Sequence, residues 1–187
     1  MIRLPCAGLL RGDDVRRAVR SAEQGRIRLA LEDLDQVLVS ARADGDLVAV
    51  GMVLGWMGVL LDQGGRRAEA RVRLQAAISL LRSRDARKPE QAFVGVLAEM
   101  RAEDGDIDGA RRALEVAAGR LRELGAWTEL GSLLVRRAIV EVLAGDPVMA
   151  VAALEDARDT CASEQVYVEI DRAVASLHLN QELAEVA

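Results

Sequence analysis

The sequence of 187 residues predicts an all-α fold, an α-α superhelix of four stacked helical hairpins with a C-terminal capping helix. Three observations predict it. The composition is rich in Ala, Leu, Val, Arg and Glu and holds only three prolines, which favours helix throughout. One stretch is apolar on every side and must be surrounded by other elements. Glycines at predicted turns recur every forty residues, which indicates an internal repeat.

The apolar stretch covers residues 47–61, LVAVGMVLGWMGVLL, and contains no charged side chain. Asp46 and Asp62 bracket it. A helix of this length is roughly 22 Å long at ~1.5 Å per residue, which is short of the ~30 Å hydrocarbon core of a bilayer. We therefore expect the central buried helix of a soluble protein, and no insertion into a membrane.

The other helices follow from apolar side chains at helical spacing and from residues that start or stop helices. Asp13 and Asp14 are the expected N-caps of the first helix. Asp46, Asp106 and Asp146 are expected to cap later helices. The expected helices cover residues 13–23, 26–41, 47–63, 66–82, 89–103, 107–124, 127–144 and 147–162. Pro89 and Pro147 are expected in first turns, Trp127 at the start of its helix, and Val166, Ile170, Val174 and Leu177 on the inner face of a last helix.

The repeat extends beyond the turn glycines. A small residue precedes each glycine by seven positions, and three more columns follow it at offsets of five, nine and twelve. Small residues on both helices of a pair let the helices cross closely, and the leucine fills the space above the crossing. The five columns are Ala18, Gly58, Ala98 and Ala138; Gly25, Gly65, Gly105 and Gly145; Ala30, Ala70, Ala110 and Ala150; Leu34, Leu74, Leu114 and Leu154; Val37, Ala77, Ala117 and Ala157.

This pattern resembles the tetratricopeptide repeat, in which a small residue, a turn, then Ala, a large apolar residue and Ala recur at these spacings. The usual repeat has ~34 residues, so we expect six extra residues to lengthen the helices and the loops between pairs. The resemblance implies a single domain with repeats at about 8–45, 46–86, 87–125 and 126–163 and a cap at 164–187. In the fourth repeat Arg137 and Glu141 replace apolar residues and are expected to form an i, i+4 ion pair.

In this family the first helix of each pair lines a concave groove that holds a segment of a partner protein. Trp56 is the expected anchor, because aromatic residues in desolvated pockets dominate binding, and Gly55 and Gly95 are expected to admit a partner's backbone. Most lining positions are apolar, which argues against a clamp for a terminal carboxylate. An alternative keeps Trp56 in the core, covered by this chain's last helix or by a second copy. The expected groove residues are Val15, Val19, Met52, Gly55, Trp56, Val59, Val96, Glu99, Val135 and Ile139.

Charge and composition limit the functions that the chain can have. The net charge of −5 argues against nucleic acid as the main partner. Two cysteines, Cys6 and Cys161, form no disulfide framework, so we expect a cytoplasmic protein. The ratio of twenty-four arginines to one lysine suggests a GC-rich bacterial genome.

An enzyme is not expected. His178 is the only histidine, and no serine or cysteine has a second histidine, a metal cluster or a phosphate loop near it in sequence. The acids at Asp104, Asp106 and Asp108 resemble the start of a calcium loop, but a helix cap explains them better. The arginines at 66–73 are interpreted as solvated helix surface. We therefore expect no catalytic residue, metal or cofactor.

Three functions remain open on the sequence alone. The first is an adaptor or scaffold whose groove holds an apolar or amphipathic segment of a partner protein. The second is a regulatory domain that senses a ligand or peptide and switches a signalling or transcription system. The third is an assembly module that associates with itself, as a homodimer or larger species.

Overall fold

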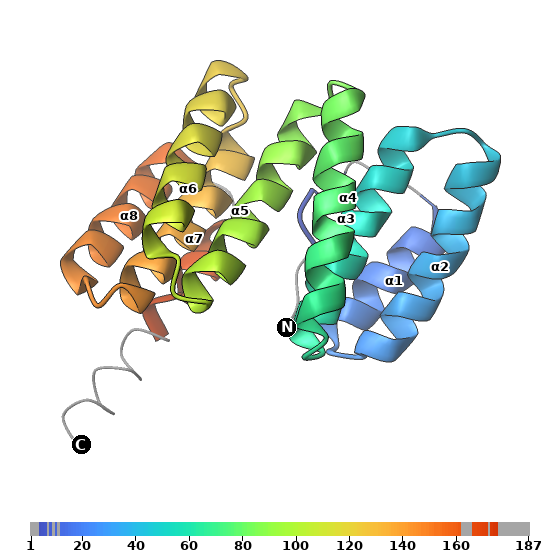
Figure 1. The fold of residues 1–187 in the computed structure, drawn as a ribbon, viewed down its shortest axis with the longest axis horizontal. Helices are drawn as coiled ribbons and strands as arrows, with labels where there is room; N and C mark the ends of the chain where they lie inside the picture. The colour runs from blue at the N-terminus through green and yellow to red at the C-terminus, as the bar shows by residue number, and fades with distance from the viewer. Residues whose placement is uncertain are drawn as a thin grey trace. The chain divides into compact units, whose positions relative to one another are not determined.

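The computed structural model describes residues 4–6, 8, 10, 12–161, 166–171 and 173–175, and these residues contain helices and no strand. The all-α prediction is therefore confirmed (Figure 1). Residues 166–171 and 173–175 add a further helical stretch after the named helices. The named helices are α1 (Asp13–Glu23), α2 (Ile27–Ala43), α3 (Leu47–Gln63), α4 (Arg67–Ser83), α5 (Arg87–Glu103), α6 (Ile107–Glu123), α7 (Trp127–Leu143) and α8 (Pro147–Thr160).

The chain divides into two compact units, Met1–Phe93 and Val94–Ala187, whose boundary falls within α5. In the first unit, α1 pairs with α2 and α3 with α4, and α2 also contacts α3. In the second unit, α7 contacts both α6 and α8. Helices adjacent in sequence therefore pack on each other, as expected for hairpins in series. The single domain that the resemblance implies stays a prediction.

The forty-residue period has a simpler origin than the sequence suggested. Each helix from α2 to α7 has 17 residues, and three residues connect every consecutive pair of helices from α1 to α8. Connections within hairpins and between hairpins thus have the same length. The expectation of longer loops between pairs is wrong, because the extra residues lie in the helices.

The connections share one backbone geometry. Gly25, Gly45, Gly65, Gly105, Gly125 and Gly145 all have positive φ, between 60° and 94°, and Asp85 has φ 54° at the one equivalent position without glycine. In each connection the next amide donates to the carbonyl five residues before it, as Arg66 N does to Leu61 O at 2.8 Å. This is the Schellman closure, which favours glycine because its left-handed backbone carries no Cβ penalty.

Helix α3 is the buried centre of the first unit, as expected. All residues from 49 to 61 are buried. Asp46 caps the helix by accepting a hydrogen bond from Ala49 N at 2.9 Å. A Cβ on Gly58 would lie 2.7 Å from Leu74 Cγ and 3.1 Å from the Ala70 carbonyl oxygen. The crossing of α3 and α4 therefore uses the small-residue column that the repeat predicted.

The remaining helix ends largely follow the sequence. Asp106 and Asp146 each cap a helix through the amide three residues on, at 2.9 and 3.0 Å, so the interpretation of Asp106 as a cap is confirmed. Asp13 and Asp14 are not N-caps: the N-cap is Gly12, and both aspartates lie in the first turn of α1. Carboxylates in a first turn still interact favourably with the helix dipole.

Part of the predicted capping helix is described. Val166 and Ile170 are buried in the core of the second unit, and Val174 packs against that core. A Cβ on Gly131 of α7 would lie 3.0 Å from a methyl carbon of Val166, so the capping helix packs directly against α7 at this glycine. Leu177, the last of the four expected contacts, lies outside the described residues.

Candidate partner-binding surface

Trp56 lies at the centre of the expected groove in the first unit. Its side chain has 0% exposure, and its indole Nε1 donates to the carbonyl oxygen of Pro5 at 2.7 Å. Leu4, next to Pro5, is 4% exposed. We call residues 4–6 the cover segment; it precedes α1, lies beside α3 and is not helical (Figure 1). Trp56 is thus enclosed within the first unit by a part of this chain that the sequence analysis did not consider.

The other expected groove residues of this unit lie on α1 and α3. Met52 and Val59 lie one helical turn before and after it and are buried, as is Val15 on α1. Val19 is half-buried. Most of the expected groove residues of this unit are therefore buried, and Val19 is the most accessible of them.

The two glycines of the expected groove contact other helices of the chain. A Cβ on Gly55 would lie 2.3 Å from Phe93 Cζ, and a Cβ on Gly95 would lie 2.6 Å from Leu133 Cδ1. Phe93, on α5, is fully buried. The expectation that these glycines leave room for a partner's backbone is therefore corrected: Phe93 and Leu133 occupy that room.

In the second unit the groove positions are apolar with one ion pair across them. Val96 and Val135 are buried, and Ile139 is half-buried. Glu99 of α5 and Arg136 of α7 form an ion pair. The pair joins the first helices of consecutive hairpins, so these two side chains hold each other rather than project separately.

A second ion-pair cluster lies on α7. The Glu141 carboxylate is buried and accepts from Arg111 Nε at 3.1 Å, and Arg137 Nε lies 3.9 Å away, so the expected Arg137–Glu141 pair is confirmed. Arg111 of α6 was missed because it is thirty residues away in sequence. Its hydrogen bond to Glu141 raises the pKa of Arg111, and this cluster holds α6 against α7.

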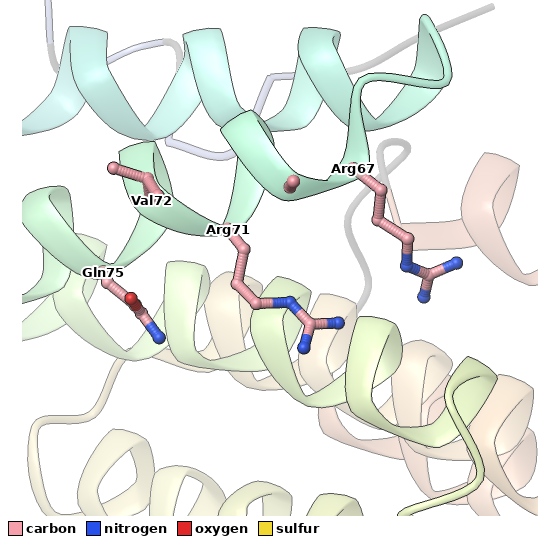
Figure 2. Close-up of a pocket in the computed structure, with 5 residues that line it drawn as sticks. Arg67, Arg71, Val72 and Gln75 are labelled. Carbon is pink, nitrogen blue, oxygen red and sulfur yellow. The ribbon is translucent and has the colours of Figure 1, made fainter.

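The arginine-rich face of α4 forms a shallow hollow of about 390 Å³, lined by Arg67, Ala68, Arg71, Val72 and Gln75. Figure 2 shows Arg67, Arg71 and Gln75 extending to the same side of the helix. Both arginines are half-buried and have interactions of their own. Arg66 and Arg73 are exposed, as expected for solvated surface.

Residues that could support chemistry are sparse in the described part of the chain. Cys6 and Cys161 are half-buried thiols in different units. Among the described residues, no three His, Cys, Asp or Glu side chains gather as a metal site would require. His178 lies outside the described residues.

Comparisons with known proteins add no family. No protein-family model matches the chain, and no curated protein matches it. Across the residues that the structure describes, no helix combines the length and apolar character needed to cross a membrane.

Proposed function

We propose that the chain is a non-catalytic adaptor of the tetratricopeptide type, which holds an apolar segment of a partner protein on the first helices of its hairpins. A bacterial cytoplasm suits its composition and its few cysteines. The first helix of the second hairpin, α3, supports the proposal, because it is apolar on every side. Its Trp56 side chain lies against main-chain atoms of another segment.

The observation that carries the proposal is the contact between Trp56 and the cover segment. The indole N–H donates to a backbone carbonyl, that of Pro5, and the neighbouring Leu4 side chain is buried. Peptides that add to a sheet edge bind through main-chain hydrogen bonds and side-chain pockets. At α3 a side-chain donor and the buried leucine take the corresponding parts. A segment of this kind is therefore what the Trp56 face of α3 accommodates.

Selection from a random peptide display library on the immobilised full-length chain tests this function. We expect apolar peptides to be enriched and to bind in solution with a measurable dissociation constant. Val19→Asp should weaken that binding by more than ten-fold, because Val19 is an expected groove residue whose side chain is only half-buried.

Val39→Asp is the matched control, since Val39 is an exposed valine of α2 in the same unit. It should leave peptide affinity unchanged. If the selection yields no peptide that binds, the adaptor function is refuted. The same holds if Val19→Asp and Val39→Asp weaken peptide binding equally.

A second candidate function is self-association. Val148 and Val151 lie one helical turn apart on α8 and are 76% and 49% exposed. Exposed apolar surface of this kind marks contact sites when it is contiguous. Light scattering on the wild type and on Val148→Asp/Val151→Asp tests this: a dimer that the double substitution converts to monomer supports self-association, and a wild-type monomer at all concentrations excludes it.

A further inference from the structure

The surroundings of Trp56 define the chemistry of the segment that covers it. On α3, Met52 and Val59 flank Trp56 and are buried with it. Against the indole lies the cover segment, a turn in which Cys6 has φ 55°, and it contributes the buried side chain of Leu4 and the carbonyl of Pro5, 2.7 Å from the indole nitrogen. The buried N–H of Trp56 is therefore satisfied by a main-chain atom fifty-one residues away in sequence.

We infer that the cover segment is an internal competitor that occupies the binding site of a leucine-containing turn segment of the partner. The inference rests on the proposed function and narrows its partner class. The buried indole N–H of Trp56 needs an acceptor, which is a backbone carbonyl here, and most helical carbonyls are already bonded within their own helix. A non-helical segment that turns, as residues 5 and 6 do, therefore fits the contact better than an amphipathic helix does. The buried leucine requires an apolar, uncharged residue beside that carbonyl.

A short tethered cover is displaceable for physical reasons. It is only three residues long, and the cost of ordering its backbone opposes the gain from burying Leu4. Because the cover segment belongs to the same chain, it nevertheless has a high effective concentration at the surface around Trp56. A partner then binds only those molecules in which the cover segment is detached from Trp56. Its apparent affinity is the intrinsic affinity multiplied by that fraction of molecules.

Opening of the cover is measured through Trp56 itself. The experiment uses the full chain with Trp127→Phe, so that Trp56 is the one remaining tryptophan of the two. Leu4→Glu places a charge in a buried position and should release the cover, which shifts Trp56 emission to the red as water reaches the indole. Leu29→Glu is the control, because Leu29 is already 38% exposed, and it should leave the emission unchanged.

A second variant guards against loss of fold in Leu4→Glu. Trp56→Phe keeps an aromatic ring but removes the donor to Pro5. Alkylation of Cys6, resolved from Cys161 by mass spectrometry of tryptic peptides, should become at least three-fold faster in this variant, while far-UV circular dichroism stays that of the wild type. Unchanged Cys6 alkylation together with unchanged emission in Leu4→Glu would overturn the inference.

Competition is then tested with two probes: a synthetic peptide of residues 3–10, RLPCAGLL, and the peptides selected from the display library. Both should bind the Leu4→Glu chain at least ten-fold more tightly than the wild type. Equal affinity of library peptides for the two chains overturns the inference and leaves the adaptor function standing. Absence of any peptide binding to either chain overturns the adaptor function, and the inference falls with it.

Discussion

Gly55 and Gly119 are both helical glycines, yet their surroundings predict opposite effects of the same substitution. A Cβ on Gly55 would lie 2.3 Å from Phe93 Cζ and 2.5 Å from both Cε atoms, whereas a Cβ on Gly119 would have no heavy atom within 4 Å. Carbon atoms normally approach to about 3.5–4.0 Å. Gly55→Ala therefore forces the Phe93 ring back by about 1 Å from that contact range.

The magnitudes follow from two opposed terms. Alanine is favoured over glycine in a helix interior by about 1 kcal/mol. Overpacking in a filled core costs about 1–3 kcal/mol, and the upper part of that range applies because Phe93 is fully buried. We expect Gly55→Ala to lower the free energy of unfolding of the first unit by about 1–2 kcal/mol. Gly119→Ala should raise that of the second unit by about 0.5–1 kcal/mol.

Urea unfolding followed by circular dichroism, with amide hydrogen exchange to separate the two units, measures both effects. Exchange is needed because the units can unfold separately, so that one midpoint does not describe both. Phe93→Leu in the Gly55→Ala background should recover part of the loss, which a double-mutant cycle reports as a coupling energy. A Gly55→Ala chain as stable as the wild type would refute the contact with Phe93.

Three further predictions concern other parts of the chain. Asp85→Gly should stabilise the chain by about 1 kcal/mol in urea unfolding, because Asp85 is the described connection residue with a Cβ at positive φ. A loss of stability would contradict the interpretation that the backbone at Asp85 is strained. Arg111→Met should destabilise the chain more than the pair Arg111→Met/Glu141→Leu does, since the single change strips the buried Glu141 carboxylate of its nearest partner; equal losses would contradict this. The hydrogen bond from Arg66 lowers the pKa of Glu69, so its small contribution to stability is present above the ordinary carboxyl pKa and is lost as the pH falls through the lowered value. Glu69→Gln should therefore reduce the difference in urea midpoint between pH 7 and pH 3, and an unchanged difference would argue against the ion pair.

The features that the sequence predicted correctly are those that short-range spacing determines. Helix starts at Asp46 and Asp106 depend on a carboxylate three residues before an amide, and that relation is visible in the chain itself. The close crossing at Gly58 was also predictable, because a small residue, Gly or Ala, recurs at this position in four repeats. Local chemistry and repetition were sufficient in these cases.

The features that the sequence missed join residues far apart in the chain. Nothing near Gly55 indicates that Phe93 fills the space above it, and a glycine beside a ring looks the same in sequence as a glycine beside a partner. Arg111 of α6 pairs with Glu141 of α7, but only the Arg137–Glu141 pair within α7 has a spacing that is recognisable in the sequence. Such contacts depend on how the helices pack, which a helical pattern does not specify.

The cover segment shows why a repeat pattern alone misplaced the boundary between core and groove. The repeat columns describe helices that contact helices, and residues 4–6 belong to no helix and no column. Leu4 and Pro5 did form an apolar pair outside every expected helix, which is a signal that such residues need burial somewhere. Residues 4–6 contact Trp56 on α3, so a segment outside the repeat fills part of the face that the repeat pattern assigned to a partner. An apolar segment outside the repeat must therefore be tested as an occupant of that face before a partner protein is proposed for it.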